Sequence, residues 1–168
     1  MEGLQGPRVR SRAISNSVFF CELLEQIKLG KVVSIRAKGW SMLPLVWDDR
    51  DILHLAAPTE RTVSVGRIIL ARMGDGRYVV HRIVAIEGNR VVMRGDGNPY
   101  QIEYLHRDKI LGELVGVRRN GKEIKRGDFL WRAIGLLWPS NAFLRRVLLF
   151  AYRRLVVRPA ATKPRRNL

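Results

Sequence analysis

Residues Arg77 to Met93 read RYVVHRIVAIEGNRVVM and give the clearest indication of the fold. Two runs rich in Val and Ile flank Gly88-Asn89, a dipeptide typical of the tight turn between antiparallel strands. Branched side chains favour strands because they pack well on a pleated surface. The sequence therefore predicts two strands, Arg77 to Ile86 and Arg90 to Met93, paired as a hairpin.

Similar short runs lie on both sides of this hairpin. Strands are predicted over Val32 to Arg36, Asp51 to Ala56, Arg67 to Arg72 and Ile110 to Val117. Two further turn signals, Gly74-Asp75-Gly76 and Asn120-Gly121, separate strand from strand. The middle of the chain is therefore expected to be a mostly antiparallel β domain.

Helical periodicity marks the two ends of the chain. A helix is predicted over Ile14 to Leu29, closed by Gly30, and a second helical region begins at Phe129. This region divides near Pro139, after which Ser140 or Asn141 can cap a helix that runs to Val157. In that last helix the apolar residues recur at three- and four-residue spacing, and the arginines fall on the other half of the wheel. The apolar set is Leu144, Val147, Leu148, Ala151 and Leu155, and the arginines are Arg145, Arg146, Arg153 and Arg154.

The predicted fold class is mainly β, with an N-terminal helix and a C-terminal amphipathic helical appendage. The 168 residues suit one domain with such an appendage. We divide them into a basic arm and helix (1–30), a β domain (31–128), a basic amphipathic helical segment (129–159) and a basic tail (160–168).

The net charge of +16 is concentrated at the two ends of the chain. Residues 39–128 carry fifteen Lys or Arg against twelve acids, whereas residues 129–168 carry nine basic residues and no acid. Such an excess attracts a protein to phospholipid headgroups or to nucleic acid. Nucleic acid is the weaker hypothesis because no recognition motif accompanies the charge.

Two interpretations of residues 129–157 remain open. The last helix could pack its apolar face on the β domain and present its arginines to water. Alternatively, the segment could lie at a membrane surface, since its aromatic rings and arginines both suit the headgroup region. No cleavable signal is evident, and no window reaches the roughly 18 apolar residues that a spanning helix needs. We therefore expect a cytoplasmic or peripherally membrane-associated protein.

Three segments offer the parts of a nucleophilic centre. Lys38-Gly39-Trp40-Ser41-Met42-Leu43-Pro44 carries a serine, Val79-Val80-His81-Arg82-Ile83-Val84 a histidine, and Arg94-Gly95-Asp96-Gly97-Asn98 a carboxylate. A serine hydroxyl is a poor nucleophile near neutral pH, so it needs a base within reach and a third group that orients the base.

These segments resemble the serine peptidase superfamily of signal peptidases and LexA-like proteins. The serine segment, with Asp49-Arg50-Asp51-Ile52 after it, is similar to the Gly-x-Ser-Met-x-Pro box of that superfamily. The second segment resembles the histidine type, found in archaeal and endoplasmic-reticulum signal peptidases, whereas bacterial type I enzymes and LexA-like repressors use a lysine. Met93 to Asn98 and Leu111 to Gly116 resemble two further boxes of the family.

The resemblance implies a serine endopeptidase for signal, leader or propeptide-like substrates. Ser41 would be the nucleophile and His81 its base, with Gly39, Met42 and Val80 at the substrate or the oxyanion. Asp96 is the first choice for the carboxylate that orients His81. The resembled enzymes place a further Asp where Ile102 stands here, and Glu103 follows it. Glu103 is therefore the second choice, and Asp108 the third.

The substrate would bind as an added β-strand between Val33 to Lys38 and Tyr78 to Arg82. No metal is expected, because His54 and His106 lack partners at ligand spacing and Cys21 is the single cysteine. No nucleotide-binding motif suggests a cofactor. The competing hypothesis is an inactive relative whose basic ends bind a membrane surface or nucleic acid.

Overall fold

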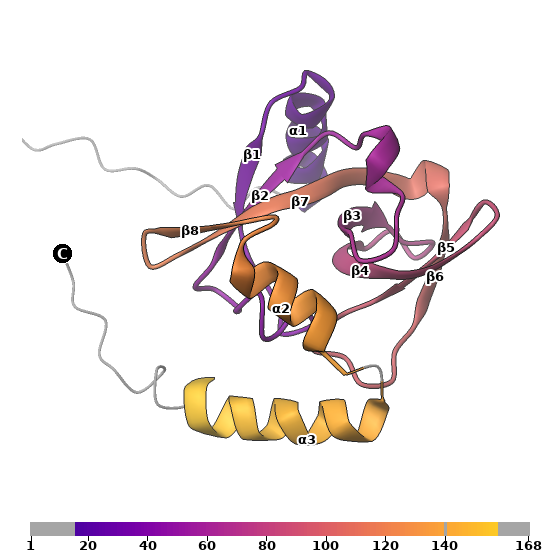
Figure 1. Ribbon diagram of the computed structural model, residues 1–168. Helices are drawn as coiled ribbons and strands as arrows, with labels where there is room; N and C mark the ends of the chain where they lie inside the picture. The colour runs from indigo at the N-terminus through magenta and orange to yellow at the C-terminus, as the bar shows by residue number, and fades with distance from the viewer. Residues whose placement is uncertain (1–15, 140, 158–168) are drawn as a thin grey trace, which may run out of the picture.

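Eight strands form one antiparallel sheet in the computed structural model, which describes residues 16–139 and 141–157 (Figure 1). The strands are β1 (Val33–Arg36), β2 (Ile52–Ala56), β3 (Ile68–Arg72), β4 (Tyr78–Glu87), β5 (Arg90–Arg94), β6 (Glu103–His106), β7 (Ile110–Arg119) and β8 (Lys122–Lys125). Their order across the sheet is β1-β2-β7-β3-β4-β5-β6, with β8 paired to β7.

Helices cover opposite ends of this sheet. They are α1 (Asn16–Lys28), α2 (Phe129–Leu137) and α3 (Ala142–Tyr152), with one-turn helices η1 (Glu60–Thr62) and η2 (Arg107–Lys109) and a π-helical end, η3 (Arg153–Val157). In Figure 1, α1 lies at the top beside β1, while α2 and α3 lie at the bottom, with α3 outermost. The predicted fold class, a mainly antiparallel β domain with helices at both ends, is confirmed. The four segment boundaries stay a prediction.

The hairpin predicted over Arg77 to Met93 is present, since β4 and β5 pair with Glu87 opposite Arg90. The Asn120-Gly121 turn joins β7 to β8, and both of its residues have positive φ, 49° and 78°. This conformation suits the right-handed twist of a hairpin, which is why Asn-Gly is favoured there. Two strands, β6 and β8, were not predicted, because each has four residues and carries charged side chains.

Two clusters of buried side chains make up most of the core, and a third joins α3 to the loop between β1 and β2. The larger lies among β1, β2, β3 and β7, where α1 contributes Leu23 and Ile27 and α2 contributes Trp131. The smaller lies among β3 to β7 and includes Ile83 and Met93. Truncating such a side chain to Ala typically lowers the free energy of unfolding by about 2–5 kcal/mol, so both clusters contribute strongly to the stability of the fold.

The last helix packs on the β domain through an unexpected face. Arg145 and Leu149 are buried, whereas Val147 and Phe150 are exposed. The expectation that Arg145 faces outward is therefore wrong. Asn141 caps the helix as predicted, since its side-chain oxygen accepts a hydrogen bond from the Leu144 amide at 3.1 Å.

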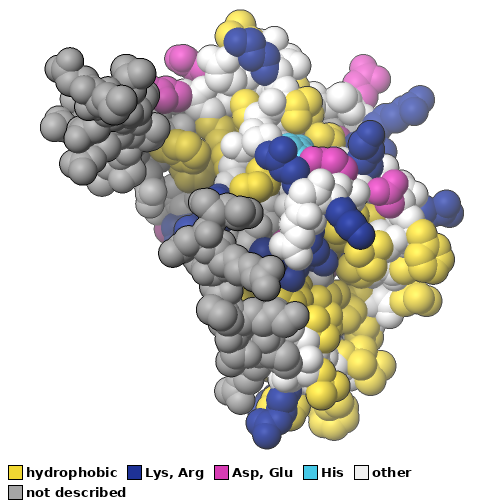
Figure 2. All heavy atoms as spheres, turned by 90° about the vertical axis from the view of Figure 1, so that its left-hand side faces the viewer, with side chains coloured by type: hydrophobic (Ala, Val, Ile, Leu, Met, Phe, Trp, Pro, Cys, Tyr) yellow, Lys and Arg dark blue, Asp and Glu magenta, His cyan; other side chains and the backbone are white. Residues whose placement is uncertain are grey.

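Hydrophobic side chains gather on the surface at the height of α3, as Figure 2 shows in its lower part. No helix in residues 16–139 and 141–157 has the length and apolar character needed to cross a membrane. The predicted basic tail (160–168), residues 1–15 and Ser140 lie outside the described residues.

Candidate active site

Ser41 lies in the loop that joins β1 to β2. The loop turns at Gly39, whose φ of +89° is in the left-handed region that side chains disfavour. The Gly39 amide donates to Asp48 Oδ1 at 2.8 Å, which fixes the turn just before the serine. Within the part of the chain that the structure describes, neither the hydroxyl nor the amide of Ser41 has a hydrogen-bond partner. Both groups remain available to a ligand.

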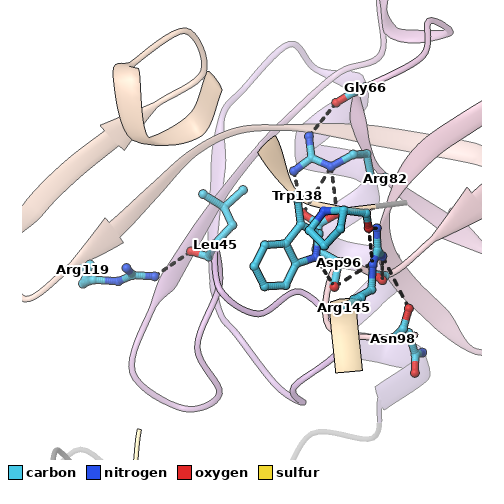
Figure 3. Close-up of polar contacts among 10 residues, drawn as sticks. Leu45, Gly66, Arg82, Asp96, Asn98, Arg119, Trp138 and Arg145 are labelled. Atoms are coloured by element: carbon cyan, nitrogen blue, oxygen red, sulfur yellow. Dashed lines mark hydrogen bonds and ion pairs between the residues drawn. The ribbon is translucent and has the colours of Figure 1, made fainter. Parts of the chain in front are cut away.

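Asp51 anchors the far end of this serine loop. Its carboxylate is fully buried, accepts the Trp47 amide at 2.9 Å and pairs with Arg119 at 2.7 Å. Arg119 also donates to the Leu45 carbonyl at 2.6 Å, so one guanidinium ties the loop to β7 (Figure 3). Burial alone would raise the pKa of Asp51, but the hydrogen bonds from Arg119, Arg50 and the Trp47 amide together hold it below its ordinary value.

His81 is held by a buried glutamate. Its Nδ1 lies 2.5 Å from Oε2 of Glu103, the first residue of β6. Both side chains are less than a tenth exposed, and Gln101 donates to the other oxygen of Glu103 at 3.0 Å. A carboxylate at Nδ1 fixes the ring orientation and places the Nδ1 proton, which leaves Nε2 as the free acceptor.

Asp96 pairs with Arg82 and not with His81. Arg82 Nη2 contacts Asp96 Oδ2 at 2.6 Å, Arg82 Nε contacts Oδ1 at 2.9 Å, and both side chains are buried. The first-choice placement of Asp96 at His81 is therefore corrected to Glu103, the second choice. Asp108, the third choice, contacts His106 and Lys109 on the surface.

The loop after β5 brings the serine and the histidine together. A Cβ atom at Gly95 would overlap the Ser41 carbonyl oxygen and lie 3.1 Å from His81 Nε2. Gly95 thus lies against both the Ser41 backbone and the His81 ring. The Gly97 amide donates to the same Ser41 carbonyl at 2.7 Å, and a Cβ at Gly97 would overlap the Trp40 carbonyl. Two glycines therefore permit the close approach of this loop to the backbone of the serine loop and to the His81 ring.

The C-terminal helices hold this glycine loop from behind. Trp138 Nε1 donates to the Asp96 carbonyl at 2.6 Å, and the buried Arg145 donates to the Gly95 carbonyl at 3.3 Å (Figure 3). Burial, with Arg94 nearby, lowers the pKa of Arg145 to about 10, so its guanidinium stays charged at neutral pH. On the serine loop, Trp47 Nε1 donates to the Tyr152 hydroxyl at 2.7 Å. α3 thus contacts both loops of the site.

Ser41 and His81 line the same groove, which has a volume of about 410 Å³. Its walls are residues 35–39 of the β1 end and residues 78–81 of β4. Gly39, Met42 and Val80 line it, and their contact with substrate stays a prediction. Phe20 of α1 stacks on Tyr78 with ring centroids 4.0 Å apart, at one end of this lining. The predicted Asp96 does not line the groove.

Both walls of the groove present strand edges with unused hydrogen-bonding groups. β1 pairs with β2 on one side, and β4 pairs with β5 only from Arg82 onward. In the described residues no strand pairs with the second edge of β1 or with that of Tyr78 to His81. Free edges are the natural sites for an added strand.

Sequence reasoning ranked Glu103 only second and missed the functions of Gly95, Trp138 and Arg145. Alternation in β6 offered a signal for Glu103, because it is on the same face as the apolar Leu105, and a glutamate on a buried face needs a partner. The glycine contacts depend on how two loops meet, and the helix contacts depend on docking. Neither can be read from a local pattern.

Metal-binding residues do not cluster in the described chain. In residues 16–139 and 141–157, no three His, Cys, Asp or Glu side chains gather as a metal site requires. The absence of a metal and of a cofactor stays a prediction.

Comparison with known proteins gives one informative similarity. No protein-family model matches the chain. A LexA repressor of Herpetosiphon aurantiacus is 31% identical over 101 residues, which cover 59% of this chain and 46% of the repressor. The match thus spans less than half the length of that relative. Together with the antiparallel sheet and its flanking helices, this similarity supports a LexA-like fold.

Proposed function

We propose that this protein is a serine endopeptidase in which Ser41 is the nucleophile and His81 the general base. One observation carries the proposal: Ser41 and a histidine held by a buried glutamate line a single groove between two free strand edges. A histidine with a purely structural role would not be expected to line a groove together with a serine. Glu103 acts through His81 and is a positioning residue.

The proposed reaction follows the two-step course of acyl transfer. His81 Nε2 accepts the Ser41 proton as Oγ attacks the scissile carbonyl, and the Ser41–carbonyl bond forms. The tetrahedral intermediate collapses when the C–N bond breaks and His81 returns the proton to the leaving amine. Water then hydrolyses the acyl-enzyme by the same proton route. The unpartnered amide of Ser41 is a donor for the oxyanion.

The substrate is proposed to be a peptide in extended conformation. Backbone groups of residues 35–38 and 78–81 would supply its main-chain hydrogen bonds, one wall on each side. Side chains of the peptide would alternate between the groove floor, near Met42 and Val46, and solvent.

The buried histidine favours the histidine type of the resembled superfamily over the lysine type. Lys38 also lines the groove, but its ammonium is mostly exposed and pairs with Asp49 at 2.9 Å. A lysine that acts as a base is usually desolvated, whereas the Lys38 side chain is mostly exposed. We therefore propose a signal, leader or propeptide-like substrate, in keeping with the histidine-type enzymes that the sequence resembles.

The test is cleavage of a panel of leader peptides in detergent by the wild-type chain and by matched variants. Ser41→Ala and His81→Ala should each lower kcat/KM by at least about 10³-fold. Ser64→Ala and His106→Ala are controls, because their side chains lie outside the groove. Cleavage that survives in Ser41→Ala, or a wild-type chain that cleaves no leader, would contradict the proposal and favour a binding module.

A further inference from the structure

The C-terminal helices expose many apolar side chains. They comprise Phe129, Leu136 and Leu137 of α2, Phe143, Leu144, Val147, Leu148 and Phe150 of α3, and Leu155 of η3, and we call this set the outer helical face. Phe129 is 87% exposed and Leu137 is 80% exposed. Isolated exposed apolar residues are ordinary, but a continuous set on adjacent helices marks an interaction site.

The outer helical face exists because α3 docks through its other side. Arg145, Leu149 and Tyr152 point toward the serine and glycine loops, where Arg145 donates to loop carbonyls and Leu149 packs with Trp47. The apolar stripe, which one of the two interpretations would bury against the β domain, is therefore turned outward. An amphipathic helix normally buries that stripe, so α3 retains an apolar face with no protein partner among the described residues.

Positive charge accompanies this face. Residues 129–157 contain five arginines and no acid, and Arg132, Arg146, Arg153 and Arg154 are exposed. Figure 2 shows Lys or Arg side chains at the lower edge of the molecule, next to the hydrophobic ones. Arginines beside aromatic and aliphatic side chains are the composition of an interfacial helix.

A cavity beside α2 adds further cationic side chains. It has a volume of about 440 Å³ and contains Arg67, Arg126 and Arg132 in its lining. Arg67 and Arg126 share the single carboxylate of Glu113, which leaves an excess of positive charge. Leu136 of the outer helical face also lines this cavity, so apolar and cationic surfaces are continuous.

We propose that the outer helical face docks on a lipid bilayer with anionic headgroups. The Phe and Leu side chains would enter the boundary between headgroups and acyl chains, and the arginines would contact phosphates. A second copy of the chain fits less well, because its arginines would face like charges. Duplex nucleic acid also fits less well, because it offers no apolar surface to the exposed Phe and Leu side chains. The inference is independent of peptidase activity.

Vesicle sedimentation with the full chain and no substrate tests this proposal. The wild-type chain should sediment with phosphatidylcholine–phosphatidylglycerol vesicles, bind phosphatidylcholine alone far more weakly and be released by salt. Phe143→Ser/Phe150→Ser should weaken binding on the order of tenfold to 100-fold. Arg146→Glu/Arg153→Glu should weaken it on the order of 100-fold.

Matched controls separate the face from overall charge. Arg61→Glu/Arg107→Glu changes the net charge equally on η1 and η2, outside the helical segment, and should retain most of the binding. Circular dichroism checks that every variant folds. Three outcomes would overturn the proposal: equal binding to neutral vesicles, equal loss in the control, or unchanged vesicle binding in both test variants. A face that instead drives dimerisation in sedimentation velocity, or binds duplex DNA but not vesicles, would also overturn it.

Discussion

His81 and Arg82 are neighbours on β4, and each contacts a buried carboxylate. His81 faces the groove and meets Glu103, whereas Arg82 faces the C-terminal helices and meets Asp96. Successive side chains of a strand point to opposite faces, so one dipeptide serves two regions. The two pairs therefore have different roles. The His81–Glu103 pair faces the groove, where it can act on a substrate, and the Arg82–Asp96 pair fixes the loop that carries Gly95.

Mutation of the groove pair, His81 and Glu103, should cause the greatest loss of activity. Glu103→Gln retains the size of the side chain but removes the charge that orients His81 and stabilises its protonated form. We expect kcat/KM for peptide cleavage to fall on the order of 10³- to 10⁴-fold, with little change in thermal stability. Asp108→Asn, at the exposed His106 contact, is the control. Equal activity of both variants would remove Glu103 from the mechanism.

Breaking the Arg82–Asp96 pair should act on stability. Asp96→Ala leaves the Arg82 guanidinium buried without its carboxylate, and a lone buried charge typically costs about 3–5 kcal/mol. Urea unfolding monitored by fluorescence measures this loss. Asp75→Ala breaks the exposed pair with Arg77 and should change stability little. If both variants unfold at the same urea concentration, Arg82 and Asp96 do not support the fold as described.

The glycine loop connects the two regions. Gly95→Ala would force a Cβ into the Ser41 carbonyl, which can be relieved only by moving the loop away from Ser41 and His81. A displacement of about 1 Å at a reacting group can cost on the order of 100-fold in rate. Gly74→Ala, where a Cβ would meet open space, should leave kcat unchanged. A fully active Gly95→Ala enzyme would show that this approach does not position the nucleophile.

The smallest effect concerns pH and Asp51. The folded-state pKa of Asp51 is lowered, so its contribution to stability is complete above the unfolded carboxyl pKa of about 3.9 and is lost as the pH falls through the folded pKa. The difference in melting temperature between wild type and Asp51→Asn should therefore be largest near neutral pH and shrink below about pH 4. A constant difference from neutral to acid pH would exclude a charged Asp51 as the anchor.

Local sequence patterns predicted most strands and both helical regions, because alternation and turn residues act over short distances. They also singled out Ser41 and His81, which line one groove in the structure. They did not find β6, whose four residues include Glu103 and His106. The wrong first choice of carboxylate has the same origin, since Glu103 can reach His81 only if β6 pairs with β5.

The sequence also did not predict which face of α3 packs on the β domain. The periodicity of α3 defines an apolar stripe and an arginine stripe, but it does not say which one meets the β domain. In the structure Arg145 satisfies loop carbonyls at Gly95 and Pro139, so an arginine face is the one that packs. Carbonyl groups at the end of a strand or a helix need hydrogen-bond donors. Which side chain supplies the donor is known only from the folded structure.

Covalent labelling with a fluorophosphonate, mapped by peptide mass spectrometry in the wild type, Ser41→Ala and His81→Ala, tests the proposed Ser41–His81 mechanism. The mechanism predicts one adduct on Ser41, lost in Ser41→Ala and formed far more slowly in His81→Ala. A wild-type chain that cleaves peptides but is labelled at another residue, or a labelling rate at Ser41 that is unchanged without His81, would contradict it.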